Sequence, residues 1–556
     1  MPDFYNLEVK IEEMIDELQG LCSQNGLSNT ADEEVIVTSV FLYKFLSDKF
    51  MYNLRKYADD ISESIEEVRE NGNDEMSAFY DAYPQDVAFQ MSDTIEALIN
   101  LSGKKDFGEI FDDTLQRISS YERNDLFKVE TIEGKKEDLF TRIVEKVSKD
   151  PDQQTAFARA VFGIIAKDKF NFSEAYATNF DFYSSIFEHL IKNYNVASGV
   201  YAEYFTPQST SHIIAKCLVG MSSIEEDKLY DIYDAAAGSG SLILHLANEL
   251  GKGKFGNKAR IYTQDVSQKS SRFLRINMML NGLTESLGNI VRGDTLLSPA
   301  QYNIKGDSSS GFRKFDYITI NPPFKMDFSS TRDSIEHIWS NTDRFFAGVP
   351  NIPSKKKKSM AIYLCFIQHV LWSLKDDGKA AIVLPTGFLT AQSSIESRIR
   401  KKLINNNWLQ GAISMPSNIF ANTGTNVSVI FIDKAKKDNE ITFIDASNLG
   451  EKRKEGKNQR TVLRDTETEK IIETFVNRKA IEDFSVVVTE QEVKEKNYSF
   501  SAGQYFEVKI DYVPITAEEF SSKMNEYIKQ ISEYNKQSNE LYASIMEQLK
   551  KVKYEE

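Results

Sequence analysis

The sequence predicts an α/β protein in three parts: an all-α N-terminal domain, a doubly wound and mainly parallel sheet domain, and a C-terminal helix. Three observations support this prediction. The first 170 residues place apolar side chains at helical spacing and contain few glycines and prolines. From Leu229 onward, short apolar runs alternate with helical stretches, and the chain closes with a heptad-like repeat. We place the three domains at residues 1–170, 171–510 and 511–556.

The N-terminal part is predicted to be helical throughout. Apolar residues recur at helical spacing near its start, at Val9, Ile11, Met14, Ile15 and Leu18. Residues 35–50 form a second apolar-rich run, and no alternating strand pattern is visible. Such a domain can be a plain solvated bundle or a specific binding surface, and the sequence leaves both interpretations open.

The central part alternates strands with helices. Strands are predicted at residues 229–235, 259–263, 290–291, 315–320, 379–384, 408–415 and 427–432. Helices are predicted at residues 241–249, 270–280 and 360–374. In a doubly wound sheet, ligands bind at the carboxyl ends of the strands. Side chains that follow the predicted strands are therefore the candidates for a functional site.

The C-terminal part is predicted to be one long helix. Thr516 and Glu519 form a capping box, preceded by Pro514. An apolar seam with steps of three and four follows at Phe520, Met524, Tyr527, Ile531, Tyr534, Leu541, Ile545 and Val552, interrupted at Ser538 and at Gln548. The seam can pack on the chain's own domain or on a helix of a partner.

Composition excludes several classes of protein. The chain has 556 residues, of which 41% are apolar and 27% are charged, so it is globular and too long for a single core. No stretch approaches the roughly 20 apolar residues of a membrane helix, and the acidic N-terminus lacks the basic region of a secretory signal. The three cysteines are far apart, and the five histidines include no pair at ligand spacing. We expect a cytoplasmic protein without a membrane segment or a metal site.

The negative charge is concentrated at one end of the chain. The formal net charge is −16, and residues 1–150 carry −18, which leaves +2 for residues 151–556. Phosphate binding needs local Lys and Arg, so an evenly acidic protein would bind nucleic acid poorly. Here the repulsion can be confined to a domain that faces away from DNA.

A glycine-rich turn follows the first predicted strand of the sheet, in the sequence Asp-Ala-Ala-Ala-Gly-Ser-Gly at residues 234–240. Its glycines permit a tight turn and a close approach to a ligand. The third glycine of the dinucleotide fingerprint is replaced by Ile243, which disfavours a pyrophosphate. The pattern suits a ligand with an amino acid moiety, such as S-adenosylmethionine, although such turns also occur as plain structural turns. The expected cofactor-binding residues are Asp234, Ala236, Gly238, Ser239 and Gly240.

Two further carboxylates follow the next two strands. Asp265 can accept hydrogen bonds from both hydroxyls of a ribose, although it can equally cap the helix that follows. Asp294, in a Gly-Asp pair, can accept from an adenine amino group or can belong to an ordinary turn. We expect both to bind the cofactor.

Asn321-Pro322-Pro323-Phe324, after the strand at residues 315–320, carries the strongest chemical signal. The two prolines fix the backbone and have no N–H. The carbonyl of Pro322 and the side-chain oxygen of Asn321 can both accept from one exocyclic amine. This frees the nitrogen lone pair for in-line attack on a sulfonium methyl group. Phe324 would stack on the base, and we expect all four residues to be catalytic.

With these motifs the sequence resembles the amino-methyltransferases that make N6-methyladenine, and above all the modification (M) subunits of type I restriction–modification systems. The resemblance implies a Rossmann-like, S-adenosylmethionine-dependent methyltransferase domain. It also implies that Phe205, Thr206 and Pro207 pack against the methionine part of the cofactor. Further matching segments begin at Arg344, Gly348, Gln368, Gly378, Met415, Thr423 and Phe443. The family commonly has Pro at the position of Ala235 and Glu at that of Asp265, and neither change removes a role.

The resemblance implies partners as well. Such M subunits act with a specificity (S) subunit that reads the DNA, typically as two M chains and one S chain. A restriction (R) subunit can add translocation and cleavage. The implied substrate is double-stranded DNA with a flipped adenine. This chain lacks a Walker A motif and an obvious repeated recognition domain, as an M subunit would.

Four consecutive lysines, Lys355, Lys356, Lys357 and Lys358, follow the Asn-Pro-Pro-Phe sequence by about thirty residues. Such a run is usually a solvated loop. Beside the catalytic pocket, it could instead neutralise phosphates that flank a flipped adenine, so we expect these lysines to bind DNA.

Two other functions are compatible with the motifs. A methyltransferase of an RNA adenine or of a protein glutamine shares Asn-Pro-Pro but commonly has Tyr next, whereas this chain has Phe324. A non-catalytic scaffold could keep the same fold, although the intact motif argues against it.

Overall fold

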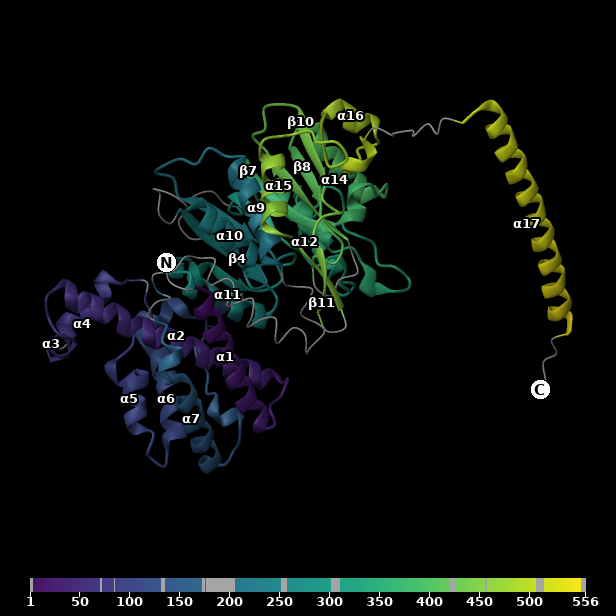
Figure 1. Ribbon diagram of the computed structural model, residues 1–556. Helices are drawn as coiled ribbons and strands as arrows, with labels where there is room; N and C mark the ends of the chain where they lie inside the picture. The colour runs from purple at the N-terminus through teal and green to yellow at the C-terminus, as the bar shows by residue number, and fades with distance from the viewer. Residues whose placement is uncertain are drawn as a thin grey trace. The chain divides into compact units, whose positions relative to one another are not determined.

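The computed structural model describes residues 4–70, 73–84, 86–131, 136–172, 176, 206–251, 258–301, 311–420, 426–455, 458–506 and 515–551. The chain forms two compact units, Met1–Tyr505 and Phe506–Glu556 (Figure 1).

The N-terminal region of the larger unit is built mainly of helices. They are α1 (Phe4–Gln24), α2 (Ala31–Asp60), α3 (Ile65–Glu70), α4 (Asn73–Ala82), α5 (Ile95–Leu101), α6 (Phe107–Ser120) and α7 (Pro151–Ile165). Thr30 caps α2 by accepting a hydrogen bond from the Glu33 amide at 3.1 Å. The predicted apolar positions of α1 and α2 form the core of this region, where Met14 and Ile15 are fully buried. The helical character predicted for this part of the chain is confirmed.

Two short strands correct the expectation that the first 170 residues are purely helical. β1 (Val129–Thr131) pairs in parallel with β5 (Ile290–Arg292) of the main sheet, and β2 (Lys136–Glu137) pairs with β1 in antiparallel fashion. Both strands are too short to show an alternating pattern. They form because the edge of the main sheet offers unpaired backbone groups, which the local sequence does not reveal.

The main sheet has the order β13-β10-β8-β9-β7-β6-β3-β4-β5-β1-β2. Its remaining strands are β3 (Tyr230–Asp234), β4 (Ala259–Asp265), β6 (Phe315–Ile320), β7 (Leu374–Pro385), β8 (Leu409–Ser414), β9 (Val427–Asp433), β10 (Glu440–Asp445) and β13 (Ser485–Thr489). β9 runs antiparallel to both of its neighbours, β7 and β8. At the two edges of the sheet, β13 is antiparallel to β10 and β2 is antiparallel to β1. All other neighbouring strands are parallel, so the doubly wound, mainly parallel sheet is confirmed.

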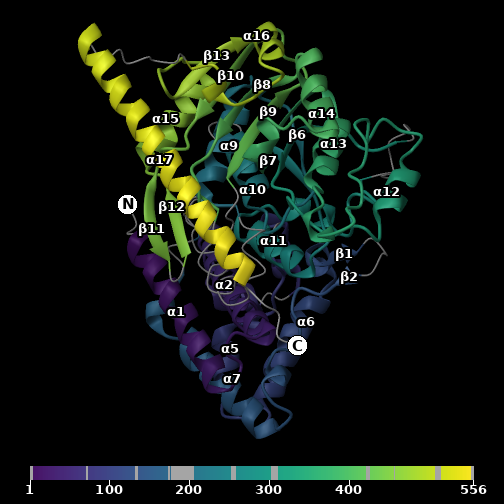
Figure 2. The same ribbon diagram turned by 90° about the vertical axis from the view of Figure 1, so that its right-hand side faces the viewer.

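Helices cover both faces of this sheet. They are α9 (Gln208–Gly220), α10 (Ser241–Leu250), α11 (Gln268–Leu280), α13 (Tyr363–Ser373), α14 (Ser394–Asn405), α15 (Asp465–Val476) and α16 (Glu490–Glu495). The short helix α12 (Arg332–Ile338) lies in the segment between β6 and β7, away from the sheet (Figure 2). Figure 2 shows α9 and α15 on one side of the sheet and α13 and α14 on the other. Short 3-10 turns lie at Met91–Asp93, Glu122–Phe127, Val144–Lys146, Asp168–Phe170, Thr284–Asn289, Lys357–Ser359, Thr386–Leu389 and Ala502–Gln504.

A separate two-stranded hairpin consists of β11 (Glu451–Glu455) and β12 (Asn458–Val462). The sequence patterns predicted seven strands of the main sheet but neither this hairpin nor β10 and β13. β13 is only five residues long and pairs on one side alone, with β10.

The smaller unit contains α17 (Ala517–Lys551). The predicted capping box is present: the Thr516 amide donates to Glu519 Oε2 at 2.9 Å, and the Glu519 amide donates to Thr516 Oγ1 at 3.2 Å. No residue of this helix is buried, and seam residues such as Ile531 and Leu541 are exposed. Val552 lies outside the described residues. Taken by itself, α17 therefore presents an uncovered apolar stripe.

Candidate active site

Asp234 ends β3 and opens the glycine-rich turn. Its carboxylate is almost fully buried, and its Oδ1 accepts a hydrogen bond from the Ala236 amide at 3.0 Å. Burial raises the pKa of Asp234 to about 8, and the nearby charge of Asp265 acts in the same direction. No basic side chain of the described residues forms an ion pair with it. A cationic group beside this carboxylate would favour its ionised form and lower its pKa.

Asp265, at the end of β4, holds the glycine-rich turn from the neighbouring strand. Its Oδ2 accepts from the Gly238 amide at 2.9 Å, and its Oδ1 accepts from the Ser267 amide at 2.8 Å. Burial raises its pKa. The N-cap of α11 is Ser267, so the alternative interpretation of Asp265 as the helix cap is wrong. Each carboxylate oxygen of Asp265 keeps a second lone pair, which can accept a hydrogen bond from a hydroxyl group.

Gly238 and Gly240 both have positive φ, +53° and +87°, as the predicted turn requires. A Cβ atom added at Gly240 would lie 2.2 Å from Leu274 Cδ1. The space next to the Gly240 Cα is thus occupied by the side chain of Leu274 in α11. The sequence pattern predicted that a ligand would approach this glycine instead.

Asp294 follows β5 and shapes the next turn. Its Oδ1 accepts from the amides of Leu296 and Leu297 at 2.9 and 3.2 Å. The adjacent Gly293 amide donates to the Asp265 carbonyl at 2.9 Å, which joins the two turns. The structure thereby brings the three predicted carboxylates, on neighbouring strands, to the same edge of the sheet.

Thr206 connects the glycine-rich turn with the Asn-Pro-Pro-Phe sequence. Asn321 Nδ2 donates to Thr206 Oγ1 at 3.1 Å, and Ser241 Oγ donates to the Thr206 carbonyl at 3.2 Å. The Asn321 amide is therefore oriented with its Oδ1 directed away from Thr206. Asn321 Oδ1 is an acceptor without a donor among the described residues.

The rest of the Asn-Pro-Pro-Phe sequence lies at the carboxyl end of β6. Pro322 is buried, while Pro323 and Phe324 are half-buried. Phe324 packs with one part against the core and leaves another part accessible. A half-exposed aromatic ring can stack on a flat base.

The lysine run lies beside this sequence. The Met326 amide donates to the Met360 carbonyl at 3.1 Å, which fixes the loop of Lys355–Lys358 next to the segment that follows Phe324. All four lysines are exposed. Hydrogen bonds from Ser329 lower the pKa of Asp327, and the charges of Lys357 and Lys358 lower it further.

A buried arginine, whose role the sequence did not suggest, supports the Asp294 turn. Arg344 is fully buried and donates to the carbonyls of Thr295 and Leu296 at 2.8 and 2.9 Å. Its Nε donates to His369 Nδ1 at 3.2 Å, so His369 is neutral and its Nε2 faces the Tyr233 hydroxyl at 3.2 Å. Burial lowers the pKa of Arg344 to about 9. Both Arg344 and His369 belong to the segments that resemble the family. This resemblance was the only feature of the sequence that pointed to them.

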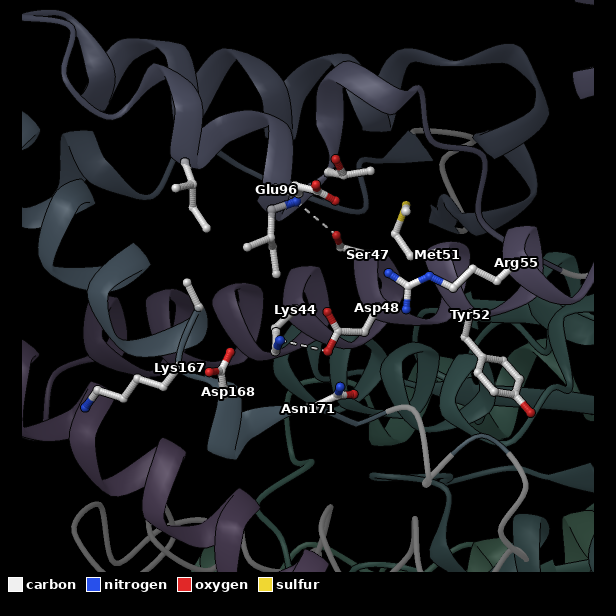
Figure 3. Close-up of a pocket in the computed structure, with 14 residues that line it drawn as sticks. Lys44, Ser47, Asp48, Met51, Tyr52, Arg55, Glu96, Lys167, Asp168 and Asn171 are labelled. Atoms are coloured by element: carbon white, nitrogen blue, oxygen red, sulfur yellow. Dashed lines mark hydrogen bonds and ion pairs between the residues drawn. The ribbon is translucent and has the colours of Figure 1, made fainter. Parts of the chain in front are cut away.

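A cavity of about 440 Å³ lies in the N-terminal helical region (Figure 3). An ion pair between Lys44 and Asp48 of α2, with 2.7 Å between Nζ and Oδ2, lies at this cavity. Ser47 accepts a hydrogen bond from the Ile95 amide at 3.2 Å. None of the predicted site residues lines this cavity, so it is separate from the site at the sheet edge.

One predicted cofactor residue, Phe205, lies outside the described residues. Within the described ranges, no cluster of three or more His, Cys, Asp or Glu is placed to hold a metal ion. Within the same ranges, no helix is long and apolar enough to cross a membrane.

Comparison with known proteins points to methyltransferases. The type I restriction enzyme MpnII methylase subunit of Mycoplasma pneumoniae is 30% identical over 342 residues, or 61% of this chain and 59% of that protein. The HindI methylase subunit of Haemophilus influenzae is 25% identical, over 67% of this chain and 79% of that protein. This chain therefore matches less than two thirds of the Mycoplasma relative's length.

Solved structures agree on the fold. The crystal structure of a type I restriction–modification system methyltransferase subunit from Streptococcus thermophilus superposes with a TM-score of 0.66 and 22% identity. The superposition covers 91% of this chain and 100% of that one. The two chains thus share their fold. The N-6 DNA Methylase profile matches residues 178–511, and the chain belongs to this family.

Proposed function

We propose that this chain is the modification subunit of a type I restriction–modification enzyme and methylates N6 of adenine within a specific DNA sequence. The observation that carries the proposal is the hydrogen bond from Asn321 to Thr206, which leaves Asn321 Oδ1 as a fixed acceptor. An adenine amine needs such an acceptor at the carboxyl edge of the sheet, where the cofactor carboxylates also lie.

The residues at that edge fit S-adenosylmethionine as the cofactor. Asp234 is a buried carboxylate without a basic partner among the described residues, which suits the ammonium group of the methionine part. Asp265 and Asp294 lie on the next two strands, where they can accept from the ribose hydroxyls and the adenine amine. Thr206 and Pro207 would flank the methionine part. When bound, the cofactor supplies an electrophilic methyl group.

The chain's own residues would prepare the adenine. Asn321 Oδ1 and the Pro322 carbonyl accept hydrogen bonds from the two N–H groups of the amine, which favours a tetrahedral nitrogen with an available lone pair. Phe324 stacks on the flipped base and holds it in line with the methyl donor. Lys355–Lys358 would neutralise neighbouring phosphates, because their loop lies beside this segment.

Assembly with a specificity subunit, a second copy of this chain and, in a complete system, a restriction subunit belongs to the same proposal. The named relatives are methylase subunits of type I restriction enzymes. In this arrangement, residues 1–170 form a helical domain, residues 171–510 the catalytic domain, and residues 511–556 the contact to the specificity subunit. The enzyme would act on double-stranded DNA in the cytoplasm.

A tritium-transfer assay tests the proposal. The complex purified from the host through a tag on this chain should transfer label from S-adenosylmethionine to N6 of adenine in DNA from a host strain that lacks this chain, and the chain alone should not. Label in RNA or in protein glutamine would identify one of the other substrate classes, and absence of any transfer would favour a scaffold.

A further inference from the structure

The β11–β12 hairpin is a basic element that the proposed catalytic function does not use. It forms a two-stranded ribbon outside the main sheet (Figure 2). Residues 451–464 contain six basic and two acidic residues, within a chain whose net charge is −16. This local excess of positive charge is the opposite of the charge of the whole chain.

The base of the hairpin is firmly attached to the domain. The Thr461 amide donates to the Asn418 carbonyl at 3.0 Å, and Thr461 Oγ1 donates to the Ser417 carbonyl at 2.6 Å. The Gly450 amide donates to Glu467 Oε1 at 3.2 Å, and Leu463 is buried. These contacts explain why the base is fixed, but they do not involve the basic side chains of β11.

The two faces of the ribbon differ in charge. Lys452 pairs with Thr461 and Lys454 with Gln459, so this face contains no acidic residue among the described positions. On the opposite face, Arg453 forms an ion pair with Glu451 at 3.1 Å. Lys452 and Lys454 are exposed, and neither forms an ion pair with a described residue. The lysine face therefore carries uncompensated positive charge.

This face also lies at the edge of the sheet that carries the candidate active site. β8 and β10 run parallel to each other and, through β9, in the same direction as β7, β6 and β3. The loop after β8 contains Ser417, which Thr461 contacts from the lysine face. β11 begins a few residues after β10 ends at the same edge. The carboxyl end of β6 places Asn321 at this edge as well.

We propose that Lys452 and Lys454 bind phosphates of the DNA duplex that flanks the flipped adenine. The inference rests on the proposed function, because that function brings duplex DNA to this edge. A two-stranded ribbon is narrow enough to follow a groove of B-DNA, and two lysines on one face are spaced for successive phosphates. Such contacts hold the duplex without reading its sequence.

The test uses the intact complex, purified from the host through a tag on this chain. Its binding to a duplex that carries the methylated sequence is measured by fluorescence anisotropy between low and high salt. Wild type is compared with Lys454→Gln, with Lys452→Gln/Lys454→Gln, and with Arg453→Gln. The last variant is the matched control, because it removes the same charge from the same ribbon on the opposite face.

Each lysine that contacts a phosphate contributes close to one to the slope of log K against log[salt]. We expect Lys454→Gln to reduce the slope by about one and the double variant by nearly two. Arg453→Gln should leave the slope close to that of wild type. S-adenosylmethionine affinity and co-purification of partners should not change in any variant.

Three results would overturn the inference: an unchanged slope in the double variant, an equal effect of Arg453→Gln, or loss of a partner protein from the lysine variants, which would make the hairpin a protein interface. Failure of the proposed function is distinguishable, because the wild-type complex would then transfer no methyl group to DNA adenine.

Discussion

Asn321 is the residue on which the catalytic proposal depends most. Replacing it with Ala removes an oriented acceptor for the amine, so Asn321→Ala should reduce methyl transfer by about 100-fold or more. Thr206→Val removes only the group that orients Asn321 and should cost about 10-fold, the size of one hydrogen bond. Calorimetry should show that Asn321→Ala still binds S-adenosylmethionine. Loss of cofactor binding together with activity would contradict the assigned role.

Asp234 should make both stability and cofactor binding depend on pH. Its pKa of about 8 in the folded, ligand-free chain lies above the value of about 3.9 expected in the unfolded chain. Its contribution to stability is therefore complete below about pH 4 and is lost as the pH rises toward 8. Asp234→Asn should raise the Tm of the ligand-free protein more at pH 8.5 than at pH 5.5.

The same substitution should weaken S-adenosylmethionine binding at pH 8.5, because an amide cannot pair with the ammonium group as a carboxylate does. In wild type, the Asp234 carboxyl must release its proton when the cofactor binds. Cofactor affinity should therefore increase by at most about 10-fold per pH unit between pH 6 and 8. Titration calorimetry at several pH values measures this. An equally steep rise in Asp234→Asn would assign the proton to another group.

At the residue scale, the sequence predicted the positions of the site residues in the sheet better than it predicted their contacts. The order of Asp234, Asp265, Asp294 and Asn321 after successive strands was enough to expect them at one edge. The bond between Asn321 and Thr206 joins residues 115 positions apart. The support that Arg344 gives to the Asp294 turn likewise depends on tertiary packing, which periodicity and spacing do not encode.

At the scale of elements, the turn between β3 and α10 limits which substitutions are tolerated. Gly240→Ala should destabilise the fold, because its φ of +87° is strained for alanine and its Cβ would meet Leu274. Gly282→Ala is the matched control, since Gly282 has φ +68° but no heavy atom within 4 Å of an added Cβ.

We expect both variants to lose about 1–2 kcal/mol for the backbone, and Gly240→Ala to lose more because of Leu274. Urea denaturation of the ligand-free protein measures the difference. Equal destabilisation would show that Leu274 moves aside easily. Loss of cofactor affinity without loss of stability would restore the simpler expectation that Gly240 faces the ligand.

Elements with a clear period could be predicted, and elements that depend on distant partners could not. The strand at 315–320 was predicted with the bounds that it has, because its apolar run is bordered by Asn321 and prolines. β1 could not be predicted, since its three residues become a strand only by pairing with β5, some 160 residues away.

At the scale of the whole molecule, α17 is the element that suggests a partner. Within the smaller unit, its seam residues are exposed and no residue of the helix is buried. Covering such side chains would contribute about 1.5–3 kcal/mol each before ordering costs. Deleting the residues after Val513 should leave a folded chain that binds S-adenosylmethionine, because Met1–Tyr505 is a compact unit.

The truncated chain should no longer co-purify with a specificity subunit and should lose specific DNA methylation. Pull-down from the host followed by mass spectrometry compares it with the full-length chain. An undiminished complex would mean that α17 is not the contact and that the assembly relies on another surface.

Genome-wide mapping of N6-methyladenine in the host tests the central claim most directly. Strains that carry the wild-type chain, a deletion of it, or Asn321→Ala are compared by single-molecule sequencing. The account predicts that one sequence motif is methylated in the wild-type strain and unmethylated in the other two. The account would be contradicted if every motif that is methylated in the wild-type strain stayed methylated in both the deletion strain and the Asn321→Ala strain.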